Sequence, residues 1–139
     1  MNTLLNSEFK TKIEVRYCET DAMGIVHHSS YVNWFELSRI RWLADLGLAY
    51  HQLERKGTQI PVIGLQVRYF KSLAFGDDVD ISLKIKYLGK ARFKYVYNVY
   101  EGEKLCATGE SEHAVVHNGR PIRIPEWFYE KFPEEPKKV

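Results

Sequence analysis

Apolar and polar side chains alternate along much of this chain, the pattern of strands that bury one face. A first alternating segment places Ile13, Val15 and Tyr17 on the buried face of a strand that ends near Cys18. Further segments of this kind follow towards the C-terminus. Their apolar positions are Ile63, Leu65, Val67 and Tyr69, then Val79, Ile81, Leu83, Ile85 and Tyr87, then Tyr95, Tyr97 and Val99, and finally those of a segment from about 105 to 117. Short Gly-containing turns separate these segments, so we expect the strands to pair as an antiparallel meander.

The segment from Tyr31 to Leu46 has a different pattern and predicts a long helix. It contains no Gly or Pro, and its apolar residues surround most of a helical wheel, so we expect the helix to be mostly buried. Ser29 and Ser30 carry side-chain oxygens suited to capping its start, and Gly47 is placed to end it. A short helix is expected to follow over residues 50–56.

The order of these segments predicts a single α+β domain. A strand, a long apolar helix and several antiparallel strands bury their apolar faces together if one curved sheet wraps around the helix. The 139 residues suit one domain of ordinary size, which we expect to span 1–139. Residues 125–132 are expected to add a last helical turn or two, and the charged, Pro-rich residues 133–139 a flexible tail.

Composition and charge exclude several classes of protein. The 20 basic and 18 acidic residues are scattered along the sequence and leave a formal net charge of +2, so no cationic face for a nucleic-acid backbone is expected. No stretch approaches the roughly 18 apolar residues that span a bilayer, and the N-terminal residues lack an apolar run of signal-peptide length. We therefore expect a cytoplasmic protein with no nucleic-acid partner and no membrane insertion.

The cysteines and histidines predict neither a disulfide framework nor a metal site. Cys18 and Cys106 are far apart in sequence and lack the spacing of metal ligands, so we expect both to be reduced thiols. The adjacent His27 and His28 are expected to point apart and match no metalloenzyme spacing with His51 and Asp21, so no metal is predicted.

The stretch between the first strand and the long helix carries the most distinctive side chains. The positions that share a characteristic spacing are Glu19, Thr20, Asp21, Gly24, Val26, His28 and Tyr31. This spacing resembles the signature of the 4-hydroxybenzoyl-CoA thioesterase group of hot-dog proteins, in particular its Tol-Pal-associated acyl-CoA thioesterase branch. The pattern there is roughly acidic-Thr-Asp-x-x-Gly-x-Val-x-His-x-x-Tyr. His27 departs from the Tyr or Phe often found at its position, which bears on the shape of the pocket. The resemblance implies the hot-dog fold, a curved antiparallel sheet wrapped around one long central helix.

The resemblance also implies an acyl-CoA thioester hydrolase with Asp21 as its catalytic carboxylate. Hydrolysis of a thioester needs a nucleophile or an activated water, and charge stabilisation for the developing oxyanion. Asp21 is suited to the first task as nucleophile or as general base, and the sequence leaves both routes open. Backbone N–H groups at the start of the helix, that of His28 in the family, suit the second task. Gly24 allows a close backbone approach, and the His28 side chain is expected to position the loop.

Substrate contacts are expected at Tyr31, which with the first helical turn lines the acyl pocket, and at Lys90 and Arg92, which would bind the phosphates of CoA. No cofactor is predicted, because CoA is part of the substrate. The resemblance implies homodimers with active sites between subunits, assembled as a homotetramer. The acyl chain preference stays open. Two alternatives also remain at this stage: a noncatalytic acyl-CoA or acyl-carrier binding module, and an enoyl-CoA hydratase.

Overall fold

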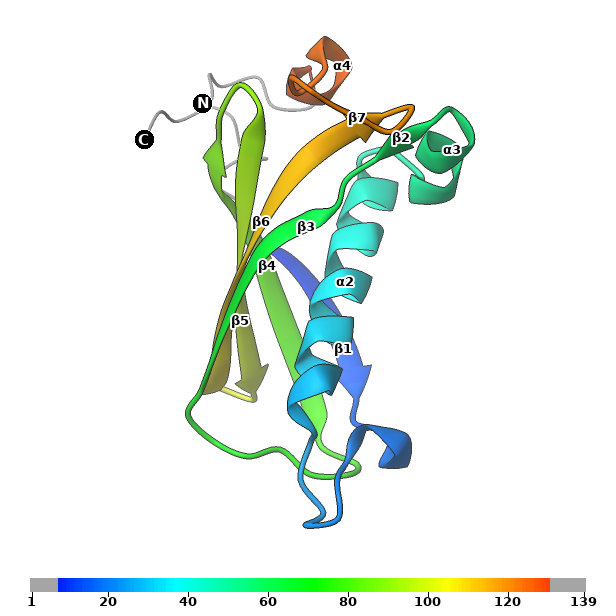
Figure 1. Ribbon diagram of the computed structural model, residues 1–139. Coiled ribbons are helices and arrows are strands. Elements are labelled where there is room, and N and C mark those ends of the chain that lie inside the picture. The colour runs from blue at the N-terminus through cyan, green and yellow to red at the C-terminus, as the bar shows by residue number, and fades with distance from the viewer. Residues whose placement is uncertain (1–7, 131–139) are drawn as a thin grey trace.

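The computed structural model describes residues 8–130 of the chain (Figure 1). In chain order its elements are β1 (Phe9–Glu14), the 3-10 helix η1 (Tyr17–Glu19), α2 (His28–Asp45), α3 (Tyr50–Arg55), β2 (Thr58–Gln59), β3 (Val62–Tyr69), β4 (Asp78–Leu88), β5 (Arg92–Glu101), β6 (Lys104–His117), β7 (Arg120–Ile122) and α4 (Glu126–Tyr129). The predicted tail, 133–139, lies outside the described residues.

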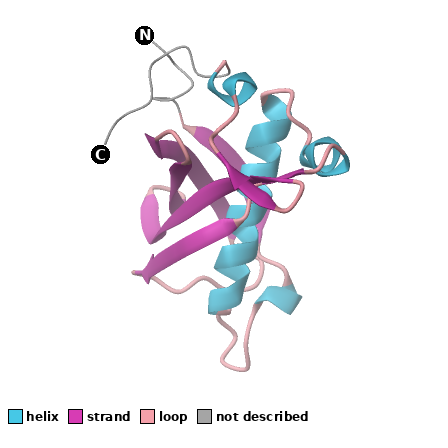
Figure 2. Ribbon diagram, turned by 45° about the horizontal axis from the view of Figure 1, so that its top comes forward, coloured by secondary structure: helices cyan, strands magenta, loops and turns pink. Residues whose placement is uncertain are grey.

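The strands form an antiparallel sheet that curves around α2 (Figures 1 and 2). Its main order is β1-β4-β5-β6, and β3 and the short strands β2 and β7 also pair with β6. The α+β hot-dog fold expected from the sequence is therefore confirmed. The Asn118-Gly119 turn between β6 and β7 is left-handed at both residues, with φ of 51° and 79°, as tight hairpins require.

The expected meander holds for β4, β5 and β6 but is wrong for β3. This strand pairs with β6 rather than with β4, which follows it in sequence. Residues 70–77 do not form a tight hairpin but cross to the other side of the sheet, where Ala74 bridges to Ile25. The turn before β4 then closes on β1, because the Gly76 N–H donates to the Val15 carbonyl at 3.0 Å. Gly76 and Asp77 therefore form the turn that ends this connection, and not a hairpin between β3 and β4.

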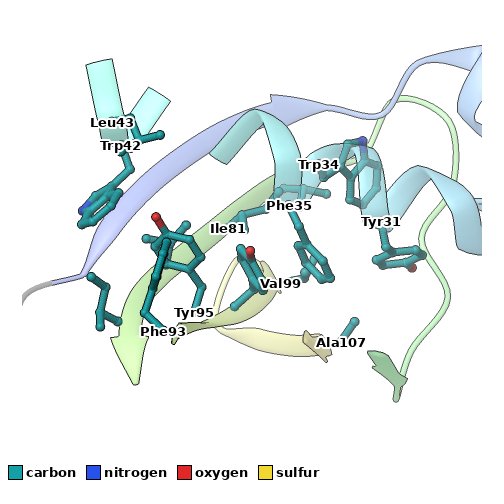
Figure 3. Close-up of a cluster of buried hydrophobic side chains, with 14 of the residues drawn as sticks. Tyr31, Trp34, Phe35, Trp42, Leu43, Ile81, Phe93, Tyr95, Val99 and Ala107 are labelled. Atoms are coloured by element: carbon teal, nitrogen blue, oxygen red, sulfur yellow. The ribbon is translucent and has the colours of Figure 1, made fainter. Parts of the chain in front are cut away.

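The core lies between one face of α2 and the concave face of the sheet (Figure 3). The Phe35 ring stacks on Tyr97 with centroids 4.1 Å apart and 11° between the planes. Beneath it, a Cβ placed on Gly109 would lie 2.4 Å from the Phe35 ring, so only glycine lets helix and strand approach this closely. The site-bearing end of α2 is thereby fixed on the sheet.

The start and the burial of α2 differ from the prediction. The helix begins at His28 rather than near Tyr31, and its cap is His27, whose ring nitrogen accepts the Ser29 N–H at 3.1 Å. A histidine acceptor is not among the usual capping side chains, so the sequence pattern favoured the serines. The helix is buried on one face only, and Ile40 on its other side is 40% exposed.

The first strand is shorter than predicted. β1 ends at Glu14, and the chain turns into η1, which leaves the Tyr17 side chain 76% exposed. The strand alternation continues past Glu14 in the sequence, but a carboxylate contact between Glu19 and the Arg16 backbone bends the chain out of the sheet.

Candidate active site

A cavity of about 360 Å³ opens where the η1–α2 loop, the start of α2 and the end of β3 meet. Of the residues with predicted roles, Asp21, His28 and Tyr31 line it together. Tyr69 and Lys71, from the end of β3 and the segment after it, contribute the facing wall. The structure thus brings the expected carboxylate, the first residue of the helix and the expected acyl-pocket tyrosine onto one cavity.

The carboxylate of Asp21 is oriented by the turn that contains it. Its Oδ1 accepts the Met23 N–H at 2.8 Å and the Ile25 N–H at 3.4 Å, and the Asp21 carbonyl accepts the Gly24 N–H at 3.0 Å. Gly24 has a φ of +82°, a conformation that residues with a side chain rarely adopt. The backbone conformation of this turn therefore favours glycine at position 24. Within residues 8–130, Asp21 Oδ2 has no hydrogen-bond donor and is available to a ligand.

His28, which lines the same cavity, has a backbone amide that is unpaired within residues 8–130. The Ser29 N–H donates to His27 Nδ1 and the Ser30 N–H to the His27 carbonyl, at 3.1 and 2.9 Å. The N–H of His28 has no acceptor within the described part of the chain. An unpaired N–H at the positive end of a helix dipole favours a bound oxygen that carries negative charge. The expectation that the two histidines point apart is wrong, because the exposed His28 ring lies 4.2 Å from the His27 ring, centroid to centroid.

Glu19 connects the Asp21 turn to the helix, a contact that the sequence pattern did not indicate. Its buried carboxylate accepts the Trp34 indole N–H at 2.9 Å, the Arg16 N–H at 2.8 Å and the Arg16 guanidinium at 3.2 Å. Its carbonyl accepts the His27 N–H and the Ser30 hydroxyl. Burial alone raises the pKa of Glu19, but these hydrogen bonds and the charge of Arg16 outweigh it and lower the pKa below its ordinary value.

The facing wall is formed by aromatic rings and one cation. Tyr31 packs edge to face on Tyr69, with centroids 5.0 Å apart. Burial raises the pKa of Tyr31 to about 12, so its hydroxyl keeps its proton at neutral pH. Lys71 bonds to Glu101 at 2.5 Å, and this hydrogen bond raises its pKa. Tyr69 and Lys71 were not predicted as site residues, because only the path of β3 brings them beside α2.

Lys90 and Arg92 lie at the opposite end of the sheet from Asp21. β4 begins beside the end of β1, where Glu14 pairs with Asp78, and runs away from the Asp21 turn to the β4–β5 hairpin that carries both residues (Figure 1). Neither lines the Asp21 cavity of its own chain.

Comparisons with known proteins agree with the hot-dog fold. A family model described as the Thioesterase-like superfamily matches residues 15–132, so the chain belongs to that superfamily. YneP of Bacillus subtilis (strain 168) is 35% identical over 131 residues, which cover 88% of this chain and 95% of that protein. Acyl-CoA thioester hydrolase YbgC of Escherichia coli is 27% identical over 116 residues, or 84% of each chain. A solved DHNA-CoA thioesterase from Staphylococcus aureus has a TM-score of 0.83 and 32% identity, covering 88% of this chain and 85% of that one.

Two further observations concern the described part of the chain. No helix in residues 8–130 has the length and apolar character needed to cross a membrane. In the same range, His, Cys, Asp and Glu side chains do not gather in groups of three that suit a metal ion.

Proposed function

We propose that this protein hydrolyses acyl-CoA thioesters to a free acid and CoA. One observation carries the proposal: Asp21, with a carboxylate oxygen that has no hydrogen-bond donor in residues 8–130, and His28, with a helix-start amide that has no acceptor there, line the same cavity. The names of the hydrolase YbgC and of the Staphylococcus aureus thioesterase agree with this activity.

The two groups suit the two needs of thioester hydrolysis. The His28 amide would bind the carbonyl oxygen and stabilise the negative charge that develops there. Asp21 would either attack the carbonyl carbon, forming a mixed anhydride that water then hydrolyses, or take a proton from the water that attacks. In both routes the carbon–sulfur bond breaks, CoA leaves as a thiolate that takes up a proton, and the acid is released. The backbone N–H groups of the turn bond to Oδ1 of Asp21, so Oδ2 is the oxygen that would take part in this chemistry.

The proposal is tested by replacing Asp21 with Asn. Asn keeps the size and one oxygen acceptor for the turn but can act neither as nucleophile nor as base. We expect kcat for thiol release from a panel of acyl-CoAs to fall by about 10²- to 10⁴-fold. Asp45→Asn, an exposed carboxylate at the far end of α2, is the control and should keep the wild-type rate. Saturable acyl-CoA binding by the wild type without turnover would instead indicate a binding module, and loss of an enoyl double bond a hydratase.

We further propose that two copies pair through the free edge of β3. Within residues 8–130 this strand pairs on one side only, with β6, and four of its apolar side chains are 44–50% exposed: Val62, Ile63, Leu65 and Tyr69. A row of exposed apolar side chains on an unpaired edge is suited to antiparallel pairing with a second copy. In an antiparallel pair, the N-terminal end of one β3 lies beside the C-terminal end of the other. The hairpin with Lys90 and Arg92 of one subunit would then lie towards the Asp21 end of its partner, where these cations could bind the phosphates of CoA. The homotetramer stays a prediction from the family resemblance.

A further inference from the structure

A second cavity, of about 540 Å³, lies at the end of the molecule opposite the Asp21 turn. α3, β2 and α4 lie at this end, whereas the loop between η1 and α2 lies at the other (Figure 1). We call it the α3–α4 cavity, because the segment 48–58 forms one wall with the end of β6, and α4 with the residue after it forms the other. Within the described chain, the α3–α4 cavity shares no lining residue with the cavity of Asp21.

The wall that contains the segment 48–58 is attached to the β6–β7 hairpin. β2 pairs with the end of β6, where Thr58 is opposite His117. Beside this pair, the Asn118 N–H donates to the Gly57 carbonyl at 2.9 Å, and Thr58 Oγ1 lies 3.0 Å from His117 Nδ1. These contacts fix the residues on this side of the cavity.

The wall that contains α4 is held by contacts of its own. The Ile124 N–H donates to the Lys90 carbonyl at 2.7 Å, and the Tyr129 hydroxyl donates to the Gly89 carbonyl. Between these two attachments, the Phe128 side chain is buried in the core. The fold itself therefore fixes both walls, and a site that is formed in advance loses less conformational entropy when a ligand binds.

Apolar side chains line the α3–α4 cavity from both walls. Leu48 and Leu53 belong to one wall and Trp127 to the other, and all of them are partly exposed to solvent. An indole ring and leucine side chains favour contact with an apolar or aromatic group of a ligand, because the contact removes apolar surface from water. A ligand for this cavity therefore needs an apolar part.

Lys56 and Glu130 carry opposite charges and line the same cavity from different walls. Both side chains are exposed, and no ion pair among residues 8–130 includes either of them. Their charged atoms are therefore more than 4.0 Å apart. A cation and an anion that do not reach each other across a cavity can each bind one end of a ligand that carries both charges.

His117 adds a polar group to the wall of Lys56. Its Nδ1 contacts the Thr58 hydroxyl, and its Nε2 has no hydrogen-bond partner in residues 8–130. When Thr58 donates to Nδ1, the ring proton is on Nε2, which can then donate to a ligand oxygen. Lys56 and His117 together suit a carboxylate, and Glu130 on the other wall suits an ammonium group.

We infer that the α3–α4 cavity binds a free amino acid with an apolar side chain. Its carboxylate would bind to Lys56 and His117 and its ammonium group to Glu130, with the side chain on the apolar residues of both walls. The inference goes beyond the proposed function and does not depend on it. α2 separates the two cavities and is 18 residues long, or roughly 27 Å, so the amino acid would not contact a thioester bound beside Asp21 in the same chain.

The first test measures the binding of L-phenylalanine to the whole chain by NMR titration, followed at the indole N–H signal of Trp127. Three analogues each lack one feature of this ligand. L-alanine lacks the apolar side chain, 3-phenylpropionate the ammonium group and 2-phenylethylamine the carboxylate. We expect saturable binding of L-phenylalanine and a Kd that is about tenfold higher or more for each analogue.

The second test assigns the two charged ends of the ligand to side chains. Lys56→Gln should raise the Kd of L-phenylalanine and 3-phenylpropionate by about tenfold and leave that of 2-phenylethylamine unchanged. Glu130→Gln should raise the Kd of L-phenylalanine and 2-phenylethylamine and leave that of 3-phenylpropionate unchanged. Lys10→Gln and Glu126→Gln, at exposed charges outside the cavity, are the controls and should bind L-phenylalanine like the wild type. Asp21→Asn, which alters only the other cavity, should do so too.

Several outcomes would overturn the inference. One is the absence of saturable L-phenylalanine binding by the wild type, and another is equal affinity for all three analogues. Binding that Lys56→Gln and Glu130→Gln leave unchanged, or that Asp21→Asn abolishes, would place the amino acid outside the α3–α4 cavity. None of these measurements uses thiol release, so their outcome is independent of the proposed hydrolysis of acyl-CoA.

Discussion

Asp21 uses its two carboxylate oxygens for different tasks. Oδ1 accepts backbone N–H groups of the turn, which is the ordinary role of an aspartate before a helix. Oδ2 has no donor among the described residues and belongs to the proposed chemistry. The structural and the catalytic interpretations of this residue are therefore compatible, because the turn holds one oxygen and leaves the other without a donor among the described residues.

The buried side chain of His113 makes the free energy of unfolding depend on pH. Its folded-state pKa of about 4 lies below the ordinary value of 6.5 because burial disfavours the charged ring. The unfolded chain therefore binds a proton first as the pH falls, and stability present above pH 6.5 is lost between pH 6.5 and 4. We expect a loss of about 3 kcal/mol in the free energy of unfolding, measured by urea titration. His113→Gln should remove this slope, and the exposed His51→Gln should keep it; a wild-type slope retained in His113→Gln would contradict the assignment.

At the scale of elements, the start of α2 and the Asp21 turn are held together by Glu19. Through one carboxylate and one carbonyl, this residue bonds to Arg16 before η1, to the residue that caps α2 and to two residues inside α2. The relative position of the carboxylate and the free His28 amide therefore depends on it. We regard Glu19 as a positioning residue that does not contact the substrate.

Glu19→Gln tests this role. The NH2 group of Gln cannot accept a hydrogen bond, so one of the Trp34 or Arg16 donors would face another donor in a buried site. We expect a loss of about 1–3 kcal/mol in stability and a fall in kcat that exceeds the change in KM. The exposed Glu14→Gln, at the end of β1, is the control. A stability loss with unchanged kcat would limit Glu19 to a structural role.

At the scale of the whole molecule, β3 is the strand whose apolar side chains stay largely exposed in the single chain. Its sequence alternates like a buried strand, but Ile63, Leu65 and Tyr69 are exposed and only Val67 packs on the core. The active-site cavity lies at the C-terminal end of this strand, where Tyr69 lines it. A second copy paired here would cover the exposed apolar side chains of β3.

Leu65→Lys tests this assembly. A lysine in the middle of β3 would bring two charges together across a two-fold interface, so we expect the mass by light scattering to shift towards that of one chain. Thiol release should fall with it, because each site would lose its partner. Leu105→Lys places the same charge on an exposed position of β6 and should leave the mass unchanged. A Leu65→Lys variant with the wild-type mass would place the interface elsewhere.

Sequence alone determined the elements whose signals are local. The period-two strands β4 to β6, the long helix and its end at Gly47, and the Asn118-Gly119 hairpin follow from side-chain periodicity and backbone preference, which neighbouring residues set. The signature around Asp21 also lies within one continuous stretch, so its residues could be named before the fold was known.

The tertiary structure decided what depends on contacts between distant segments. One example is the pairing of β3 with β6, and another is the approach of Tyr69 and Lys71 to the start of α2. A third is the series of hydrogen-bonding contacts from Arg39 through Tyr97 and Ser111 to His113. Each joins residues far apart in sequence, and no local pattern specifies such neighbours. The same limit explains the wrong cap. Which group accepts the Ser29 N–H depends on how the Glu19 contacts place His27, and that is a property of the folded loop.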